Sequence, residues 1–375
     1  MKFSDVSGIE LFAGCGGLST GFLDSGLNVV AGFELDRRAV DAYEYNHGYR
    51  GSHGHQADLS SLESALLLSR AGLRQVDFLI GGPPCQPFSI AGKQRGESDH
   101  RADLMNRFAS YISELLPRVF MLENVPNLAA IHGGRVLQRF LEAVSGSGYA
   151  MRAEVVRAAD YGVAQMRKRL IVLGIRGVDQ VEFPVPTHGI GKLPHRTAHD
   201  VLFDLPDVAD FGECDIHNHE PTQHSLGMLQ RLSVLQPGKR EPGSFQDRLH
   251  PNRVSYTLRA GSGNFSPLRP IHYRYDRVIS VRESARIQGF SDHFIWPDRI
   301  PRLQQYRQVG NAVPPSLAAA FAKSIAMQLG WRLQPERFVG DPASRPPAMQ
   351  LTDAQRKSQR AERTRGASLG MLASA

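Results

Sequence analysis

Ile9-Glu10-Leu11-Phe12-Ala13-Gly14-Cys15-Gly16-Gly17 is the stretch that decides the fold. Its apolar first half is typical of a buried strand, and its glycines let the chain turn sharply and approach a ligand closely. The dinucleotide-binding fingerprint would require a third glycine at position 19, where this chain has Ser19. The stretch therefore predicts a strand, a turn and a helix that together hold a nucleoside. A plain tight turn is the alternative.

Outward from this stretch, apolar runs and helical patterns continue to alternate. Strands are expected at 27–33, 76–80, 119–122 and 170–175, and helices at 17–25, 37–46, 104–116 and 136–144. Such alternation predicts an α/β fold with a largely parallel sheet that is covered by helices on both faces. Open sheets of this kind bind ligands at the carboxyl ends of their strands. Four candidate groups follow such ends: Gly14, Glu34, Cys85 and Glu123.

Composition and charge limit the possible functions. The 375 residues are 41% hydrophobic and 22% charged, which suits a globular protein of two domains or of one large domain with an insertion. We find no run of about 18 apolar residues and no signal peptide. Three cysteines are too few for a disulfide framework, so we expect a cytoplasmic protein. The net charge of +7 permits a polyanionic partner without requiring one.

A thiol in a stiff loop follows the strand expected at 76–80. The prolines of Pro83-Pro84-Cys85-Gln86-Pro87 fix the backbone and remove amide donors, so the loop presents Cys85 rigidly. A buried structural cysteine is the usual alternative, but such residues lie within apolar runs. Cys85 is therefore a candidate nucleophile, provided that its neighbours favour the thiolate. The polar segment 91–103 is a candidate lid.

A carboxylate and two arginines follow later in the chain. Glu123 emerges directly from the strand at 119–122, so burial is expected to raise its pKa and let it donate a proton. Arg167 and Arg169 alternate on an extended segment and therefore share a face, where they would polarise a carbonyl oxygen and hold a thiolate. The alternatives are a structural carboxylate that binds backbone amides and a salt-bridged surface pair of arginines.

Two further carboxylates suit a nucleoside. Glu34 lies twenty residues beyond Gly14, at the end of the second strand, where a carboxylate accepts hydrogen bonds from ribose hydroxyls. Asp58 follows a poorly patterned segment that is expected to be a further strand, and it is a candidate for contacting an adenine amino group.

Together these segments resemble the cytosine C5 DNA methyltransferase family. The glycine loop resembles its S-adenosylmethionine loop, Pro84-Cys85 its catalytic motif, and Glu123-Asn124-Val125 and Gln165-x-Arg167-x-Arg169 two further motifs. Its last two motifs are matched, in the family's order, by Arg282-Glu283-Ser284-Ala285-Arg286-Ile287-Gln288-Gly289-Phe290 and Gln308-Val309-Gly310-Asn311-Ala312-Val313-Pro314-Pro315. The resemblance covers nearly everything from 9 to 329, except about 185–249. Glu10, Ala164 and Ser291 depart from the common pattern, but none of these departures removes a reacting group.

The resemblance implies a Rossmann-like S-adenosylmethionine-dependent methyltransferase sheet with helices on both faces, plus a smaller mixed target recognition domain. The catalytic domain would span 1–184 and be completed by a return segment and helix at 301–334. The target recognition domain would span 185–300, and a basic tail at 335–375 is expected to be disordered. S-Adenosyl-L-methionine would be the cofactor, and its binding residues would be Phe12, Gly14, Gly16, Gly17, Glu34, Asp58, Pro83 and Asn311.

The resemblance also implies a reaction, with Cys85, Glu123, Arg167 and Arg169 as its catalytic residues. Cys85 would add to C6 of cytosine and so make C5 nucleophilic, while Glu123 would protonate or hydrogen-bond N3 and Arg167 or Arg169 would hold O2. After methyl transfer a base would remove the C5 proton and Cys85 would leave. The target cytosine would flip out of double-stranded DNA, and the loop at 91–103 would close over it.

The second domain is expected to contact DNA. Between 231 and 286, eleven Lys and Arg stand against four Asp and Glu. Candidate DNA contacts in the whole chain are Ser89, Arg101, Tyr256, Thr257, Arg259 and Gly261. The segment 282–290 is expected to be a structural seam between the domains. A zinc site could be formed by Cys214, His217, His219 and His224. Their spacing follows no common zinc finger, so no metal is expected.

The leading hypothesis is a monomeric DNA methyltransferase that does not bind membranes and that protects its sequence from a cognate restriction endonuclease, without a stable complex. An RNA (transfer RNA) cytosine methyltransferase of the same family is the near alternative, although the basic variable region favours DNA. A non-catalytic DNA-binding relative is disfavoured by the retained Cys85, Glu123 and arginines. A nicotinamide oxidoreductase is disfavoured by Ser19 and by the rigid cysteine loop.

Overall fold

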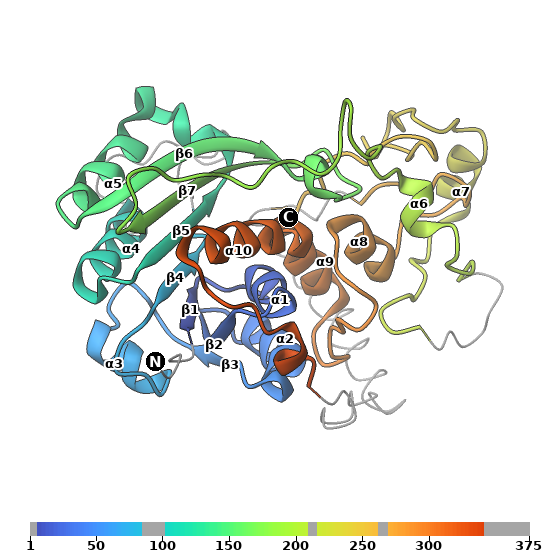
Figure 1. The fold of residues 1–375 in the computed structure, drawn as a ribbon. Coiled ribbons are helices and arrows are strands. Elements are labelled where there is room, and N and C mark those ends of the chain that lie inside the picture. Colours follow the sequence, from blue (N-terminus) through green and yellow to red (C-terminus); the bar gives the residue numbers. More distant parts are fainter. Residues whose placement is uncertain (1–5, 85–101, 209–215, 262–268, 341–375) are drawn as a thin grey trace, which may run out of the picture.

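The computed structural model describes residues 6–84, 102–208, 216–261 and 269–340 (Figure 1). In these residues a seven-stranded sheet runs in the order β3-β2-β1-β4-β5-β7-β6. Its strands are β1 (Ser7–Leu11), β2 (Asn28–Glu34), β3 (His53–Gln56), β4 (Phe78–Gly81), β5 (Val119–Asn124), β6 (Tyr149–Arg157) and β7 (Lys168–Arg176). The expected α/β class is confirmed.

The direction of the strands changes at one end of the sheet. Strands β3, β2, β1, β4 and β5 are parallel, whereas β7 is antiparallel to both β5 and β6. The sequence did not predict β6, because its residues 152–155 are exposed and include Arg152 and Glu154. Charged residues on an exposed edge strand protect it from pairing with another chain, but they also remove the apolar pattern by which a strand is recognised.

Helices cover both faces of the sheet, as expected. One face packs against α1 (Gly17–Asp24) and α10 (Pro315–Leu329), and α2 (Arg37–His47) lies beside β3. The other face packs against α3 (Ser64–Arg70), α4 (Ala102–Leu115) and α5 (Arg135–Ser145). Within β4, Phe78 and Ile80 belong to the first core and Leu79 to the second, because successive side chains of a strand point to opposite faces. Such doubly covered strands appear in sequence as nearly continuous apolar runs.

The helix α10 returns from late in the chain to pack on α1. It begins at Pro315, where a missing N–H costs nothing, and ends before Gly330, whose φ of 63° suits the left-handed cap of a helix. The Ser25 hydroxyl donates a hydrogen bond to the Ala319 carbonyl oxygen at 3.3 Å. Residues beyond 300 thus complete the helical layer that covers the first strands.

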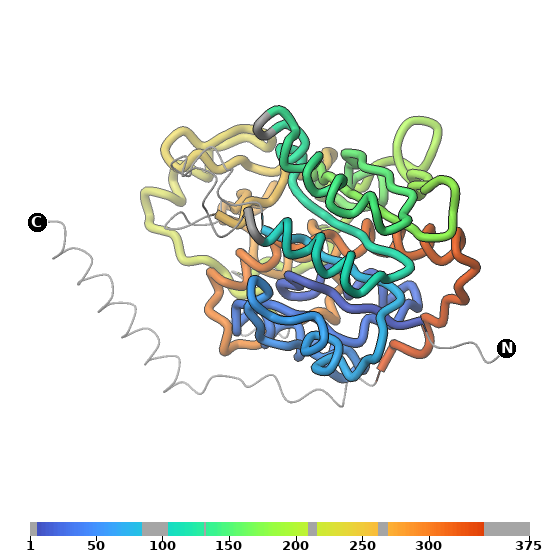
Figure 2. Tube along the Cα trace, turned by 90° about the vertical axis from the view of Figure 1, so that its left-hand side faces the viewer, coloured from blue at the N-terminus to red at the C-terminus, as the bar shows by residue number. Residues whose placement is uncertain are grey.

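The rest of the chain lies beside the sheet and includes α6 (Ala198–Leu202), α7 (Leu226–Ser233), α8 (Val281–Gln288) and α9 (Arg302–Asn311). In Figure 2 its yellow segments gather at the upper left, away from the blue strands and helices near the N-terminus. Its main apolar cluster centres on Trp296 and also includes Cys15 and Ala42, while Met228 and Leu232 belong to a separate small cluster. The exact domain boundaries stay a prediction.

The segment expected as a seam is mostly buried, and its residues up to Gln288 belong to α8. Its Arg282 guanidinium donates to the carbonyl oxygens of His217, Ser291 and Phe294, so one side chain ties two loops together. Glu283 accepts two hydrogen bonds from Arg277, at 2.8 and 3.0 Å, and also receives the Ser280 N–H at the helix start. A buried ion pair with several hydrogen bonds fixes geometry more than it adds stability.

In the part of the chain that the structure describes, no helix has both the length and the apolar character needed to span a bilayer.

Candidate active site

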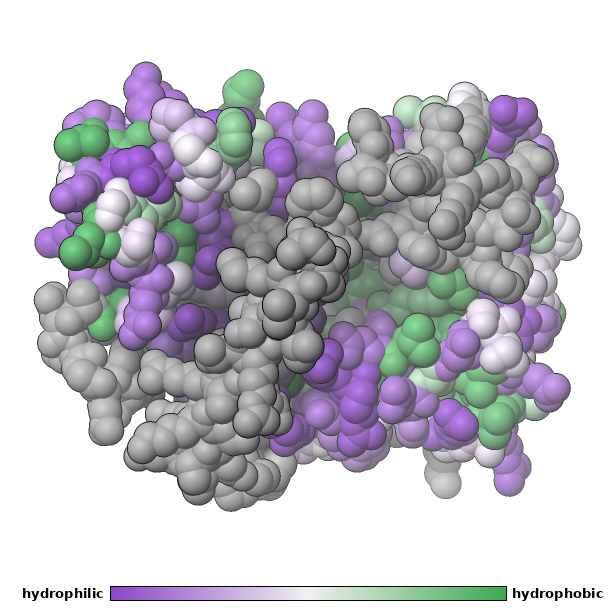
Figure 3. Space-filling model, turned by 180° about the vertical axis from the view of Figure 1, so that it is seen from behind, coloured by the Kyte–Doolittle hydropathy of each residue, from purple (hydrophilic) through white to green (hydrophobic). Residues whose placement is uncertain are grey.

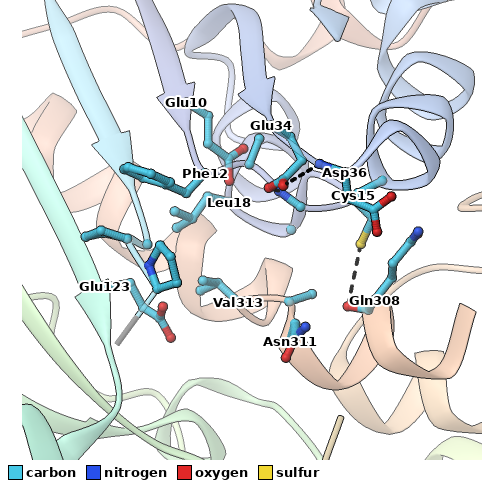
Figure 4. Close-up of a pocket in the computed structure, with 18 of the residues that line it drawn as sticks. Glu10, Phe12, Cys15, Leu18, Glu34, Asp36, Glu123, Gln308, Asn311 and Val313 are labelled. Atoms are coloured by element: carbon cyan, nitrogen blue, oxygen red, sulfur yellow. Dashed lines mark hydrogen bonds between the residues drawn. The ribbon is translucent and has the colours of Figure 1, made fainter. Parts of the chain in front are cut away.

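A deep pocket of about 840 Å³ opens at the carboxyl ends of β1, β2, β4 and β5. Figure 4 shows Glu34 and Asp36 on one side of it and Glu123 on the other, with Asn311 and Val313 between them. Of the described residues, 30 line the pocket. They come from the glycine loop, the segments around Glu34 and Asp58, the Gly82-Pro83-Pro84 turn, the segment of Arg167 and Arg169, and α9. Parallel strands explain this convergence, because their carboxyl ends meet at one edge of the sheet.

The glycine loop forms one wall of the pocket. Phe12 has a φ of 56° and Gly14 a φ of 55°, so the chain twists through the left-handed region directly after β1. That conformation is unfavourable for Phe12 by about 1–2 kcal/mol, which is a cost that clusters at functional sites. Gly14 lines the pocket, whereas Gly16 is buried beneath Tyr43 and His47 and does not. Among the predicted cofactor residues, Gly16 therefore allows the tight turn to form but does not line the cavity.

Glu34 fixes the glycine loop to the end of β2. One of its carboxylate oxygens accepts the Gly14 N–H at 2.9 Å, and the other accepts the N–H groups of Leu35 at 2.8 Å and Asp36 at 3.0 Å. A carboxylate has about four acceptor positions, so it can take a further donor from a ligand. The sequence indicated a ribose contact here, and the structure adds the role of holding the loop.

Asp58 lies at the opposite end of the pocket from Glu123 and is exposed. Hydrogen bonds from the Ser60 hydroxyl and N–H reach the same Asp58 oxygen and lower the pKa of its carboxyl. Sequence reasoning missed two neighbours that also line this end, Leu35 and Asp36. Their position directly after Glu34, past the end of β2, was the available signal. Exposed Leu35 offers an apolar surface for a flat ring.

Glu10 is a buried carboxyl in the pocket wall. Ser19 donates both its N–H, at 2.9 Å, and its hydroxyl to one Glu10 oxygen, and the Ser19 hydroxyl also meets the Tyr43 hydroxyl at 2.8 Å. Burial raises the pKa of Glu10 to about 8, so this group is neutral at pH 7. Ser19 thus carries out a structural task at the position where a dinucleotide-binding loop would have glycine.

Glu123 and the two arginines meet at the other end of the pocket. Glu123 is buried at the end of β5, as expected, and Arg169 Nε lies 2.6 Å from its Oε1. Arg167 is buried, and its guanidinium donates to the Asn311 carbonyl oxygen at 3.4 Å. Burial, followed by the neighbouring charge of Arg169, lowers the pKa of Arg167 to about 9, which leaves it cationic at neutral pH. Both arginines line the pocket, so the prediction that they share a face is confirmed.

The proline turn after β4 reaches the same end. The Asn124 amide donates to the Pro83 carbonyl oxygen at 3.0 Å, and Pro83 and Pro84 both line the pocket. Cys85 is the next residue along the chain, but it lies outside the described residues, as do Ser89 and Arg101. Gly82, at the start of this turn, lies against the Glu123 carboxylate, so the turn that leads to the predicted nucleophile begins beside Glu123.

Two glutamine hydrogen bonds join the late motifs to the pocket. The Gln165 amide donates to the Gln288 side chain at 2.6 Å, and the Gln288 amide donates to the Ala312 carbonyl oxygen. Asn311 lines the pocket beside Val313. The motifs from 165, 288 and 311 thus form one unit behind the cavity, which no local sequence pattern could reveal.

The predicted DNA-contacting residues form a short exposed segment. The Thr257 hydroxyl donates to the Met166 carbonyl oxygen at 2.9 Å, and the Leu258 N–H donates to the Gln165 side chain at 3.0 Å. Tyr256, Thr257, Arg259 and Gly261 are exposed. This segment therefore runs beside the residues that lead into Arg167, at the edge of the pocket.

The histidines considered for zinc have other partners. His219 is buried, with Nδ1 bonded to the Ser280 hydroxyl at 2.7 Å and Nε2 to the Pro206 carbonyl oxygen at 2.9 Å. His224 accepts the Val278 N–H at 3.2 Å. Cys214 lies outside the described residues. Within the described residues, no group of three His, Cys, Asp or Glu side chains could hold a metal ion.

Comparison with known proteins identifies the family. The C-5 cytosine-specific DNA methylase family matches residues 6–327. The chain is 33% identical over 327 residues to the type II methyltransferase M1.HphI of Haemophilus parahaemolyticus, covering 84% of this chain and 86% of that protein. It is 32% identical over 372 residues to M.XorII of Xanthomonas oryzae pv. oryzae, covering 88% and 86%.

Solved structures agree with this assignment. A prophage-encoded E. coli protein, described as a DNA modification methyltransferase, superposes with a TM-score of 0.73 at 26% identity and covers 87% of this chain and 99% of its own. S. pombe Dnmt2 superposes with a TM-score of 0.64 at 16% identity, which shows the shared fold alone, over 86% and 98%. The site, the sequence match and the fold agree, and the chain belongs to the C-5 cytosine-specific DNA methylase family.

Proposed function

We propose that this protein methylates C5 of cytosine within a specific double-stranded DNA sequence, with S-adenosyl-L-methionine as methyl donor. The observation that carries the proposal is one pocket in which Glu123, Arg167 and Arg169 meet the proline turn at one end, while carboxylates and the glycine loop occupy the other. The relatives named above are type II methyltransferases, so the protein would protect DNA from a cognate restriction endonuclease.

The acidic end of the pocket fits the proposed cofactor. Glu34 would accept ribose hydroxyls and Asp58 the adenine amino group, with Leu35 against the ring and Phe12, Gly14, Gly17, Pro83 and Asn311 around the remainder. The carboxylates of Glu34, Asp36 and Asp58 suit a ligand that carries positive charge. When bound, the cofactor supplies an electrophilic methyl group to C5, and the protein supplies position and electrostatics.

The basic end suits the developing charge on cytosine. In the proposed mechanism the Cys85 thiolate adds to C6, and the ring electrons move toward C5 and onto N3 and O2. Glu123 holds a proton at N3, and Arg167 or Arg169 donates hydrogen bonds to O2. C5 would then bond to the methyl carbon of the cofactor, with the electron pair of the broken sulfur–methyl bond left on the cofactor sulfur. A base then removes the C5 proton, the electrons of the C5–H bond restore the C5–C6 double bond, and the Cys85 thiolate leaves C6. Arg169 beside Glu123 also keeps the carboxyl oriented toward the base.

Access to this pocket requires an extruded nucleotide, because a base stacked in a duplex cannot enter a deep cavity. We propose that residues 185–300 are the target recognition domain, that Tyr256, Thr257, Arg259 and Gly261 contact DNA, and that Ser89 and Arg101 act near the flipped base. The protein would act in the bacterial cytoplasm as a monomer, without a stable endonuclease complex.

Transfer of labelled methyl groups from S-adenosyl-L-methionine tests the proposal. Duplex DNA should become labelled, transfer RNA should not, and Cys85→Ser should abolish transfer while leaving cofactor affinity unchanged. Bisulfite sequencing of DNA from an expressing host would then report the product and its sequence context together. Parental activity of Cys85→Ser would exclude the covalent mechanism, and labelling of transfer RNA instead of DNA would exclude the substrate.

A further inference from the structure

We propose that Phe245 is a DNA-contacting residue whose ring stacks on the bases or sugars of the duplex beside the target cytosine. The inference rests on the proposed DNA substrate and adds a specific side chain to it. Phe245 was not among the residues that the sequence singled out, since an isolated phenylalanine in a polar segment has no recognisable pattern.

The loop that carries Phe245 is closed by hydrogen bonds and an ion pair at its base. Arg240 and Asp247 pair as an antiparallel bridge, and their side chains form a two-point ion pair at 2.8 and 2.9 Å. Inside it, the Glu241 N–H donates to the Gln246 carbonyl oxygen at 2.8 Å, and the Phe245 N–H donates to the Glu241 carbonyl oxygen at 2.9 Å. The residues between 240 and 247 therefore form a tight turn with a fixed tip.

A buried carboxylate holds this turn in shape. Glu241 is almost fully buried, accepts the Ser244 N–H and pairs with Arg231 Nε at 3.0 Å. Hydrogen bonds from Ser244 lower the pKa of Glu241 to about 2, so the carboxylate stays ionised at every pH at which DNA is bound. The turn is thus maintained by its own internal contacts and needs no contribution from the Phe245 ring.

The backbone conformation at position 245 is unfavourable for phenylalanine. Its φ of 56° lies in the left-handed region, where glycine and asparagine are favoured over a bulky side chain. Its side chain is 66% exposed, and in the described part of the chain no aromatic ring packs on it. Among the described residues, neither backbone preference nor core packing explains a phenylalanine here, which fits a ring whose benefit comes from a bound partner.

The base of the turn adjoins the segment that leads to the proposed DNA contacts. The Gly238 N–H donates to the Arg248 carbonyl oxygen at 3.0 Å, and Gly238 lies against the side chains of His250 and Arg253. Tyr256 is 43% exposed, and the next residue, Thr257, bonds to the Met166 carbonyl beside the pocket. The segment from 248 to 257 thus joins the base of the Phe245 turn to the edge of the pocket, where the Ser255 N–H donates to the Ala164 carbonyl oxygen.

The surroundings of Phe245 favour a nucleic acid over a protein partner. Lys239 and Arg240 are exposed on the same turn, and such cations bind phosphates while an aromatic ring stacks on a base. In Figure 3 the lobe at the left, which carries α6 and α7, shows single apolar residues among polar ones. A stable protein interface needs about 800 Å² from each partner, far more than one ring supplies.

The salt dependence of DNA binding tests the proposal. With a duplex that contains the sequence identified by bisulfite mapping, Phe245→Ala should weaken binding by about 5- to 150-fold at every salt concentration. Its log–log salt slope should equal that of the parent, because the ring neutralises no phosphate. Lys239→Gln should instead reduce the slope by about 1. Affinity for S-adenosyl-L-methionine should stay at the parental value in both variants.

Two controls separate DNA contact from a structural role. Phe203 is 60% exposed with an ordinary φ of −64°, and Phe203→Ala should bind DNA like the parent. Phe245→Gly relieves the left-handed strain, so its melting temperature should equal or exceed the parental value although its DNA binding falls. Parental DNA affinity of Phe245→Ala, or an equal loss in Phe203→Ala, would overturn the inference. Failure of the parent to bind any duplex would instead overturn the proposed function, and this inference with it.

Discussion

Replacement of Gly17 by alanine should damage the cofactor pocket by a predictable amount. A Cβ atom at Gly17 would lie 2.3 Å from the Val313 carbonyl oxygen and 3.2 Å from the Ala312 Cβ. Real carbon–oxygen contacts are about 3.5 Å, so α1 and the segment at 312–313 would have to separate by about 1 Å. Neither neighbour is the end of a flexible side chain, so the backbone itself has to move.

The cost follows from the kind of contact. Overpacking of a tight interior contact costs about 1–3 kcal/mol, and both Gly17 and Val313 line the pocket. If that free energy is lost from cofactor binding, affinity for S-adenosyl-L-methionine falls by about 5- to 150-fold. Strain that is present with or without ligand lowers only the stability of the fold, whereas affinity falls to the extent that the movement of Gly17 and Val313 deforms the pocket that both line. We therefore expect weaker binding together with a lower melting temperature.

Isothermal titration calorimetry and thermal unfolding measure the two parts. Gly146 is the matched control, because it has an ordinary φ of −71° and a Cβ there would meet no atom within 4 Å. Gly146→Ala should change stability by no more than about 0.5 kcal/mol and leave cofactor affinity unchanged. Parental affinity and parental melting temperature in Gly17→Ala would refute the close packing of α1 against the 312–313 segment.

Two further predictions concern the buried carboxyl of Glu10 and the guanidinium of Arg169. Burial raises the pKa of Glu10 from 4.5 to about 8, so the folded protein keeps a proton that the unfolded chain releases above pH 4.5. The free energy of unfolding should therefore fall as the pH rises from about 5 to 8, and urea titrations of Glu10→Gln should show a flatter dependence; equal slopes would contradict this. Arg169→Ala removes the cation 2.6 Å from Glu123 and should slow single-turnover methyl transfer by about 10²–10³-fold with unchanged cofactor affinity. Arg176→Ala, at the far end of the same strand, is its control, and a parental rate in Arg169→Ala would refute the role.

Much of the first half of the chain was predictable from local pattern. The run 119–122 is apolar because β5 is buried on both faces, and the same burial applies to Glu123 at its end. The alternation at Arg167 and Arg169 placed both side chains on the pocket side, as a two-residue repeat requires. Late in the chain, the stretch 301–334 was expected to hold a returning helix, and α10 begins there at Pro315 and ends before Gly330.

Other features depended on contacts between distant parts of the chain. No pattern of neighbouring residues predicts the antiparallel edge of the sheet or the ion pair of Arg169 with Glu123. The same is true of the hydrogen bond from Arg167 to the Asn311 carbonyl oxygen, 144 residues away. The dual role of Glu34 and the strained tip at Phe245 likewise appear only when the backbone is folded. Sequence by itself determined the apolar strands that are buried on both faces, because burial acts on neighbouring residues, whereas the exposed strand β6 left no such pattern. Only tertiary structure decided which of these residues meet, because strand order and helix return bring together groups that no spacing along the chain relates.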